Sequence, residues 1–349
     1  MAGSIPTTTY AAWTANWDTP VDHLMRGRDD SQDNHLVVAK DGSGRYQTVQ
    51  DAVNAASALR LRGHRRRIVI YVKAGVYEEI VTVASILTDL TMMGDGMGST
   101  IITGSRSVAG GYTTFSSPTF SVFGDRFIGT GITFRNSYGP GSQAVALLSG
   151  SDQSVFYRCA IEGYQDTLCV YTQRQFYREC NIMGTIDFIF GNAAVVIQNS
   201  KILLRRPNRG EANVITAQGR TDPNQNTGIV IQFSRITAAD DLWPVRHSVK
   251  SFLGRPWMKY SRTVYLQNDI SSAIDRLGWM AFKGNFALNT LYYAEFKNTG
   301  PGSVMSSRVR WRGFHIIIRP AAVRKFTVAN FIAGGAWLPA AHVPHFLGL

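Results

Sequence analysis

The chain has 349 residues, 44% of them hydrophobic, which excludes a disordered tail or a short peptide and allows a large buried core. Its 36 Lys and Arg against 24 Asp and Glu give a net charge of +12, which favours an anionic partner such as nucleic acid, acidic lipid or acidic polysaccharide. With 33 Gly and only 17% charged residues, the composition argues against helical bundles and coiled coils and favours a turn-rich β protein.

At the N-terminus, residues 1–34 contain Thr, Asp and Pro but no basic stretch followed by an apolar one, so they do not resemble a secretion signal. We predict a poorly ordered N-terminal extension over residues 1–34 and one domain over residues 35–349. No apolar run approaches the roughly 18 to 20 residues of a membrane span, so we expect no membrane partner.

One segment predicts a helix. Thr48–Leu61 (TVQDAVNAASALRL) places five apolar residues on one helical face: Val49, Ala52, Val53, Ala56 and Leu59. From Ile68 onward, short runs such as IVIYV, IVTVA and TIITG alternate with Gly, Asn and Asp. Short apolar runs separated by such turn residues predict many short strands.

A similar phrase recurs five times and closes on an isoleucine each time: Phe156–Ile161, Phe176–Ile182, Val196–Ile202, Val230–Ile236 and Val264–Ile270. The closing isoleucines are 21, 20, 34 and 34 residues apart. Repeats of this length built from short strands indicate a solenoid. We therefore predict an all-β fold, a right-handed parallel β-helix with one short N-terminal helix.

The solenoid has consequences for the cysteines and the C-terminus. One coil of about 21 residues advances the chain by one strand spacing, roughly 4.8 Å, so residues 21 apart stack. Cys159 and Cys180 are 21 apart, which predicts a disulfide or, alternatively, two inward-facing thiols in a core ladder. Cys169 is expected to be a free thiol, and no Cys–His spacing predicts a structural metal. We expect Phe326–Leu349 to cap the solenoid end, where a strand edge must be covered.

Two carboxylates lie in apolar surroundings 21 residues apart: Asp166 in GYQDTL and Asp187 in GTIDFIFG. Stacked on neighbouring coils, they cannot both ionise cheaply, so one pKa rises and the pair supplies an acid together with a base or nucleophile. The alternative is that each Asp caps a turn or satisfies backbone amides.

Three further residue types favour a polar reaction at this pair. Gln143 lies 22 residues before Gln165, and two side-chain amides can stabilise a developing oxyanion, or simply form a ladder within the solenoid. In LGRPW, Arg255 can hold a carboxylate and Trp257 can stack on a sugar face. Alone, that motif is weak.

Several motifs together resemble the plant pectinesterases, the pectin methylesterases of the cell wall. The resemblance runs from about His35 to the C-terminus and is carried by GVYEE (75–79), QAVAL (143–147), GYQDTL (163–168), GTIDFIFGNAAVV (184–196), TAQGRTDPNQNTG (216–228), LGRPW (253–257) and NFALNTLYYAEFKNTGPG (285–302). It implies a β-helical enzyme that hydrolyses the C6 methyl esters of polygalacturonate to methanol and pectate, without metal or cofactor.

The resemblance also implies roles for individual residues. Asp187 matches the nucleophile and Asp166 the general acid and base, while Gln143 and Gln165 match the oxyanion donors. Arg255 matches the residue that orients the nucleophile, and the substrate contacts are Thr113, Gln143 and Trp257.

By the same resemblance, the partner is methyl-esterified homogalacturonan, and a proteinaceous pectinesterase inhibitor is a candidate second partner. We expect a secreted, monomeric cell-wall enzyme that binds no nucleic acid. Basic clusters such as Arg60–Arg67 either attract polygalacturonate or are solvated surface.

The sequence departs from the family pattern at four positions. Cys169 stands where a cleft Tyr is frequent and Tyr171 where a His is frequent, which predicts one weakened sugar subsite. Ser200 and Ser234 stand where a second cysteine pair is frequent, so that disulfide is absent here.

Three other functions are weighed against the esterase. A β-helical glycoside hydrolase would also use two carboxylates, and a non-catalytic polysaccharide-binding solenoid would need neither. A serine esterase is disfavoured, because the sequence contains no Gly-x-Ser-x-Gly.

Overall fold

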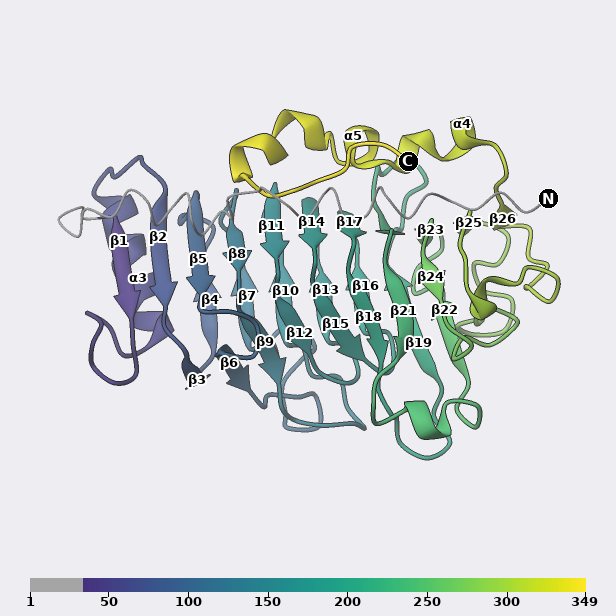
Figure 1. The fold of residues 1–349 in the computed structure, drawn as a ribbon, viewed down its shortest axis with the longest axis horizontal. Coiled ribbons are helices and arrows are strands. Elements are labelled where there is room, and N and C mark those ends of the chain that lie inside the picture. The colour runs from purple at the N-terminus through teal and green to yellow at the C-terminus, as the bar shows by residue number, and fades with distance from the viewer. Residues whose placement is uncertain (1–33) are drawn as a thin grey trace, which may run out of the picture.

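The computed structural model describes residues 34–349, which form three parallel sheets of eleven, seven and eight strands (Figure 1). The chain visits the sheets in turn and winds as a right-handed parallel β-helix, as predicted. Apart from Asn34, the predicted N-terminal extension lies outside the described residues.

The strands of each sheet follow the order of the coils. The eleven-stranded sheet contains β1 (His35–Val38), β2 (Ile68–Val72), β5 (Leu90–Gly94), β8 (Ile128–Thr130), β11 (Ser154–Tyr157), β14 (Arg174–Arg178), β17 (Ala194–Gln198), β20 (Gly228–Gln232), β23 (Arg262–Leu266), β25 (Tyr292–Phe296) and β26 (Phe314–Ile316). The eight-stranded sheet contains β3 (Gly75–Glu78), β6 (Thr100–Gly104), β9 (Thr133–Asn136), β12 (Ala160–Glu162), β15 (Asn181–Gly184), β18 (Lys201–Leu204), β21 (Arg235–Ala238) and β24 (Asp269–Ile270). The seven-stranded sheet contains β4 (Val81–Val83), β7 (Phe120–Val122), β10 (Leu147–Ser149), β13 (Leu168–Val170), β16 (Ile189–Gly191), β19 (Asn213–Gln218) and β22 (Ser251–Gly254).

The register of the eight-stranded sheet matches the sequence repeat. Ile161 pairs with Ile182, Ile182 with Ile202, Ile202 with Ile236 and Ile236 with Ile270. The two 34-residue coils keep this register because their additional residues lie in turns, for example residues 205–212 and 239–250. The spacing of the closing isoleucines therefore predicts the strand pairing correctly.

Helix α3 (Val49–Leu61) packs against the first strands of the solenoid. Thr48 caps it by accepting a hydrogen bond from the Asp51 amide, and the Glu79 carboxylate accepts from the amides of Val49 and Gln50. Four of the five predicted apolar residues are buried, and Leu59 is partly buried against the core. The predicted helix is confirmed.

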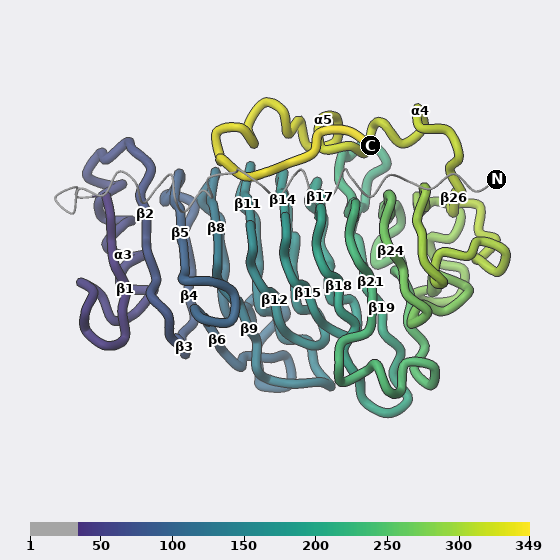
Figure 2. The backbone as a smooth tube through the Cα atoms, viewed as in Figure 1, coloured from purple at the N-terminus to yellow at the C-terminus, as the bar shows by residue number. Residues whose placement is uncertain are grey.

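The C-terminal segment covers a sheet face rather than the solenoid end. It contains two short helices, α4 (Pro320–Val323) and α5 (Val328–Phe331), and runs back along the eleven-stranded sheet (Figures 1 and 2). Phe326, Phe331 and Leu338 share a buried cluster with outward-facing sheet residues such as Val196 and Val230. The expectation of an end cap is wrong, because these apolar side chains on the outer face of the sheet require the cover.

The predicted disulfide between Cys159 and Cys180 is also wrong. Both are buried free thiols, as is Cys169, so the alternative of two inward-facing thiols describes the pair. They precede Ala160 and Asn181, which pair across neighbouring strands, so the two Cβ atoms point the same way at strand spacing, about 4.8 Å. A disulfide needs about 3.5 to 4.5 Å. Each thiol instead donates to a backbone carbonyl, Cys159 to Tyr157 and Cys180 to Phe156.

Ser200 and Ser234 continue the same column of inward-facing side chains. The Cys180 amide donates to the Ser200 hydroxyl at 3.1 Å, and the Ser200 amide donates to the Ser234 hydroxyl at 3.1 Å. These serines therefore satisfy backbone donors at the turns that lead into β15 and β18.

Thiol titration tests this column. Under denaturing, non-reducing conditions we expect three reactive thiols per chain, and we expect a reductant to leave the thermal unfolding midpoint unchanged. One reactive thiol, together with a midpoint lowered by reductant, would contradict the structure, because a disulfide typically contributes about 2 to 4 kcal/mol.

Candidate active site

A pocket of about 250 Å³ opens beside the seven-stranded sheet, where the chain enters its strands from the eight-stranded sheet. Six of the predicted site residues line it: Gln143, Gln165, Asp166, Asp187, Arg255 and Trp257. Five others also line it: Thr114, Phe115, Phe190, Ala217 and Phe282. Residues from at least six successive coils, those of β7, β10, β13, β16, β19 and β22, therefore meet at one place.

The two carboxylates lie at equivalent positions of neighbouring coils. Asp166 precedes Leu168 of β13 and Asp187 precedes Ile189 of β16 by the same two residues, and Leu168 pairs with Ile189. Both aspartates have left-handed backbone, with φ of 60° and 51°. Such backbone is uncommon for side chains other than Gly and Asn or Asp, and it costs energy at a sharp turn. Here the turn directs both carboxylates into the pocket.

Arg255 holds Asp187 with two hydrogen bonds. Its Nε donates to Oδ1 at 2.8 Å and its Nη2 donates to Oδ2 at 2.6 Å. Arg255 directly follows β22, two strands from β16, and the buried Ala217 of the intervening strand β19 is small enough to leave space beside the pocket. The guanidinium also lies 4.8 Å from the ring centroid of Phe282. This bidentate geometry fixes the orientation of the Asp187 carboxylate.

The electrostatics separate the two aspartates. Burial raises the pKa of Asp187, and the hydrogen bonds and charge of Arg255 oppose that rise. Burial raises the pKa of Asp166 well above its ordinary value, the Asp187 charge raises it further, and Arg255 opposes it more weakly. The arrangement favours a protonated Asp166 beside an ionised Asp187, which is an acid next to a nucleophile or base.

The two glutamines stack beside the pair. Gln143 and Gln165 form a parallel β-bridge, and the Ala144 amide donates to the Gln165 carbonyl at 3.1 Å. The 22-residue offset shortens to 21 at Leu147 and Leu168, so Gln143's coil has one additional residue there. Within residues 34–349 neither side-chain amide has a hydrogen-bond partner, which leaves both donors available to a ligand.

An aromatic wall stands on the other side. Trp257 packs edge-on against Phe190 at 6.0 Å between ring centroids. Gly219 makes this packing possible, because a Cβ there would lie 2.9 Å from the indole Cε3 atom. Cys169 is buried in the cluster that supports this wall; burial raises the pKa of its thiol, and the Asp166 charge raises it further.

Two positions that the sequence singled out, Thr113 and Tyr171, do not line the pocket. Thr113 is not among the lining residues, and its hydroxyl is hydrogen-bonded to Ser116 while Thr114 and Phe115 face the pocket. Tyr171 is exposed and packs edge-on against Phe115 at 5.4 Å. Tyr171 thus contacts a lining residue without lining the pocket itself.

The sequence indicated some of the missed lining residues. Phe190 lies three residues after Asp187 in a motif already recognised, so strand alternation could have placed it on the outer face. Phe282 lies in an irregular turn after β24, and no spacing rule connects it to the pocket.

Residues 34–349 contain neither a metal-binding cluster of side chains nor a helix that could cross a membrane. No group of three or more His, Cys, Asp or Glu could hold a metal ion in this part of the chain. None of its helices has the length and apolar content that a membrane crossing requires.

Comparison with known proteins identifies the family. The model of the pectinesterase family matches residues 35–335. Pectinesterase 2 of Citrus sinensis is 60% identical over 316 residues, which are 90% of this chain and 61% of that protein. The pectinesterase of Daucus carota is 53% identical and is covered over 98% of its length.

Solved structures agree. The pectin methylesterase from carrot superposes with a TM-score of 0.88 at 53% identity, covering 90% of this chain and 98% of that one. The enzyme from Aspergillus niger gives a TM-score of 0.75 at 31% identity, covering 89% and 98%. This chain therefore belongs to the pectinesterase family, as its motifs predict. It spans about three fifths of the length of the first curated relatives.

The raised pKa of Asp166 predicts that this residue lowers the free energy of unfolding at neutral pH. Because the folded state binds this proton more tightly than the unfolded state does, the free energy of unfolding falls as the pH rises from the unfolded pKa through the folded one. One pKa unit corresponds to about 1.4 kcal/mol. We expect Asp166→Asn to raise the denaturant midpoint at pH 7, with a gain that shrinks below about pH 4.

Asp269→Asn is the matched control, because Asp269 is an exposed aspartate outside the pocket. It should leave the midpoint almost unchanged at either pH. An Asp166→Asn variant that is less stable than the parent at pH 7 would contradict the assigned electrostatics.

Proposed function

We propose that this protein is a pectin methylesterase, which hydrolyses the methyl ester at the C6 carboxyl of polygalacturonate to a free carboxylate and methanol. The observation that carries the proposal is the Asp187 carboxylate, held by both donors of Arg255 beside an Asp166 whose pKa is raised. Membership of the pectinesterase family supports the same reaction.

In the first half-reaction, an oxygen of ionised Asp187 attacks the ester carbonyl carbon and forms a tetrahedral intermediate. The amides of Gln143 and Gln165 donate hydrogen bonds to its oxyanion; one such donor is worth roughly 3 to 4 kcal/mol. As the C–O bond to methoxide breaks, Asp166 transfers its proton to the leaving oxygen. Methanol leaves, and the substrate acyl group is bound to Asp187 as an anhydride.

In the second half-reaction, Asp166 is ionised and accepts a proton from water. The resulting hydroxide attacks the acyl carbon, a second tetrahedral intermediate collapses, and the Asp187 carboxylate leaves. Asp166 is protonated again and the product carries one new carboxyl group. Arg255 keeps the leaving Asp187 carboxylate oriented throughout.

The remaining lining residues bind the polymer. Trp257 offers an aromatic face for a sugar ring, and Gln143 contributes its amide to the bound unit. Thr113 is assigned to substrate contact through its segment, whose neighbours Thr114 and Phe115 line the pocket.

The family also suggests where the protein acts and what it meets. The substrate is methyl-esterified homogalacturonan in the plant cell wall, reached by secretion, and the enzyme acts as a monomer. Relatives such as the probable pectinesterase/pectinesterase inhibitor 17 of Arabidopsis thaliana, 54% identical, carry an inhibitor in their names. A pectinesterase inhibitor is accordingly a second candidate partner.

Replacing the nucleophile tests the reaction. We expect Asp187→Ala to lower methanol release from highly methylated pectin by at least about 10³-fold, because the carboxylate that forms the acyl intermediate and is oriented by Arg255 is removed. Methanol is measured together with new reducing ends. Asp269→Asn serves again as the control and should retain full activity.

Unchanged methanol release from Asp187→Ala would refute the mechanism. New reducing ends without methanol would identify a glycoside hydrolase, and neither product from the parent protein would indicate a non-catalytic binding solenoid.

Gly219→Ala tests the aromatic wall. An added Cβ would press on the Trp257 indole and displace it, so we expect KM for pectin to rise severalfold while kcat changes little. Gly335→Ala is the control, because its Cβ would meet only ordinary contacts. An unchanged KM would show that the indole does not bind the sugar chain.

A further inference from the structure

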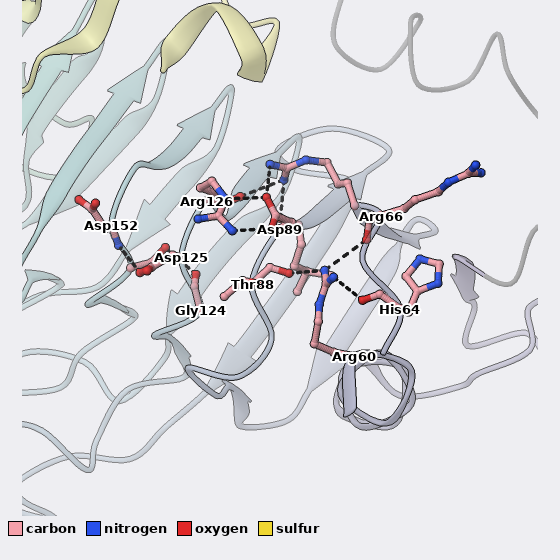
Figure 3. A network of polar contacts seen from close by, with 12 residues as sticks. Arg60, His64, Arg66, Thr88, Asp89, Gly124, Asp125, Arg126 and Asp152 are labelled. Carbon is pink, nitrogen blue, oxygen red and sulfur yellow. Dashed lines mark hydrogen bonds and ion pairs between the residues drawn. The ribbon is translucent and has the colours of Figure 1, made fainter. Parts of the chain in front are cut away.

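The last turn of α3 and the loop that follows it carry the sequence Arg60–Arg67, and two of these arginines, Arg60 and Arg67, point inward. Arg60 donates through Nη1 to the His64 carbonyl at 2.6 Å, and through Nη2 to the carbonyls of Arg66 at 3.3 Å and Thr88 at 2.5 Å (Figure 3). These bonds tie both ends of the loop to the turn before β5. Specific hydrogen bonds therefore hold this loop against the solenoid.

Arg67 fixes the far end of the loop. Its Nη1 donates to the carbonyls of Leu90 at 3.3 Å and Arg126 at 2.9 Å, and its Nη2 lies 3.5 Å from Asp89 Oδ1. Burial lowers the pKa of Arg67, and the Asp89 charge opposes that shift.

Three arginines of the same loop point to solvent: Arg62, Arg65 and Arg66, which we call the arginine ledge. All three are exposed, and no carboxylate of residues 34–349 forms an ion pair with them. Figure 3 shows the Arg66 side chain extending away from the network that holds the loop.

The acidic residues nearby are already occupied. Asp89 is paired with Arg126 at 2.6 Å, and Asp152 is paired with Arg174 at 2.6 Å. Asp125 accepts a hydrogen bond from the Asp152 amide at 3.0 Å. Hydrogen bonds from Arg126 lower the pKa of Asp89 against the opposing effect of burial. Burial acts to raise the pKa of Asp152, but the hydrogen bonds and charge of Arg174 together lower it. Among residues 34–349, the three positive charges of the ledge are therefore not neutralised by a carboxylate.

The ledge is separate from the pocket. It lies where the chain enters β2, whereas Asp187 belongs to the coil that begins with β14. Four strand spacings separate β2 from β14 in the eleven-stranded sheet, about 19 Å along the axis. The ledge also lies where the chain enters the eleven-stranded sheet, and the pocket where it enters the seven-stranded one.

We propose that the arginine ledge is a second polymer-binding site, which takes a demethylated, carboxylate-bearing stretch of homogalacturonan. This inference rests on the proposed function. A polyuronate presents a carboxylate on every unit, and guanidinium groups match carboxylates in geometry and charge. Each ester that the pocket hydrolyses turns a neutral unit into an anionic one, so the ledge binds the product more tightly than the substrate.

Binding at the ledge keeps the polymer attached to the enzyme while the pocket acts on it. A pectin chain long enough to span both sites is held at the ledge by its demethylated part, which raises the local concentration of its remaining esters at the pocket. Retention on the polymer then grows as the reaction proceeds.

The test compares two variants that lose the same charge. Arg62→Gln, Arg65→Gln and Arg66→Gln together remove the ledge and leave Arg60 and Arg67 in place. The control combines Arg310→Gln, Arg312→Gln and Arg319→Gln, three exposed arginines near the other end of the solenoid. Binding to fully demethylated polygalacturonate is measured across a series of NaCl concentrations.

We expect the ledge variant to bind about tenfold more weakly at low salt, with the slope of log K against log[NaCl] reduced by about one to two. The control should change affinity by less than about threefold. Equal losses in both variants would overturn the proposal, since only net charge would then matter. An equal ledge effect with a DNA oligonucleotide of matched charge would overturn the assignment to a uronate.

Methanol release from a short methylated oligogalacturonide separates this inference from the proposed function. The ledge variant should keep the parent's kcat and KM on that substrate, because it cannot reach both sites. If the parent released no methanol, the proposed function would fail, whereas the salt-dependent binding would still report on the ledge.

Discussion

In-register stacking of parallel coils is the constraint on which the site depends. It places residues at equivalent positions of successive coils one strand spacing apart, about 4.8 Å, whatever their chemistry. Isoleucines fill the core in this way, and Asp166 and Asp187 meet in the same way. The backbone ladder maintains a juxtaposition of carboxylates that their charges oppose.

The repulsion between these two carboxylates lowers the stability of the fold, and it also provides the protonated acid that the proposed function needs. Two buried carboxylates on adjacent coils raise each other's cost of ionisation, and Arg255 relieves it for Asp187 far more than for Asp166. An arginine placed symmetrically between them would ionise both and leave no acid. The bidentate bond to one carboxylate therefore creates the difference in proton affinity that an ester hydrolase needs.

Much of this could be predicted from spacing, because a solenoid converts sequence separation into distance. The isoleucine register and the convergence of Gln143, Gln165 and the two aspartates follow from it. The cysteine pairing does not, because stacking brings two Cβ atoms near each other without the approach and the angle that a disulfide requires. The placement of the C-terminal segment depends on apolar side chains of the outer sheet face, and Phe282 lies in an irregular turn, so neither carries a periodic signal.

The turns of the solenoid accept additional residues and the strands do not, and most residues that line the pocket lie in turns. The two long coils insert residues into turns without shifting any strand. The turn after β22 supplies two residues that line the pocket, Arg255 and Trp257. At the entry to the eleven-stranded sheet, the same left-handed backbone found at Asp166 and Asp187 recurs at Asp89 and Arg126, where it carries an ion pair instead. The same left-handed backbone conformation thus occurs at two edges of the solenoid. Because the ladder fixes the strands independently of the turns, each edge can carry a different set of charged side chains.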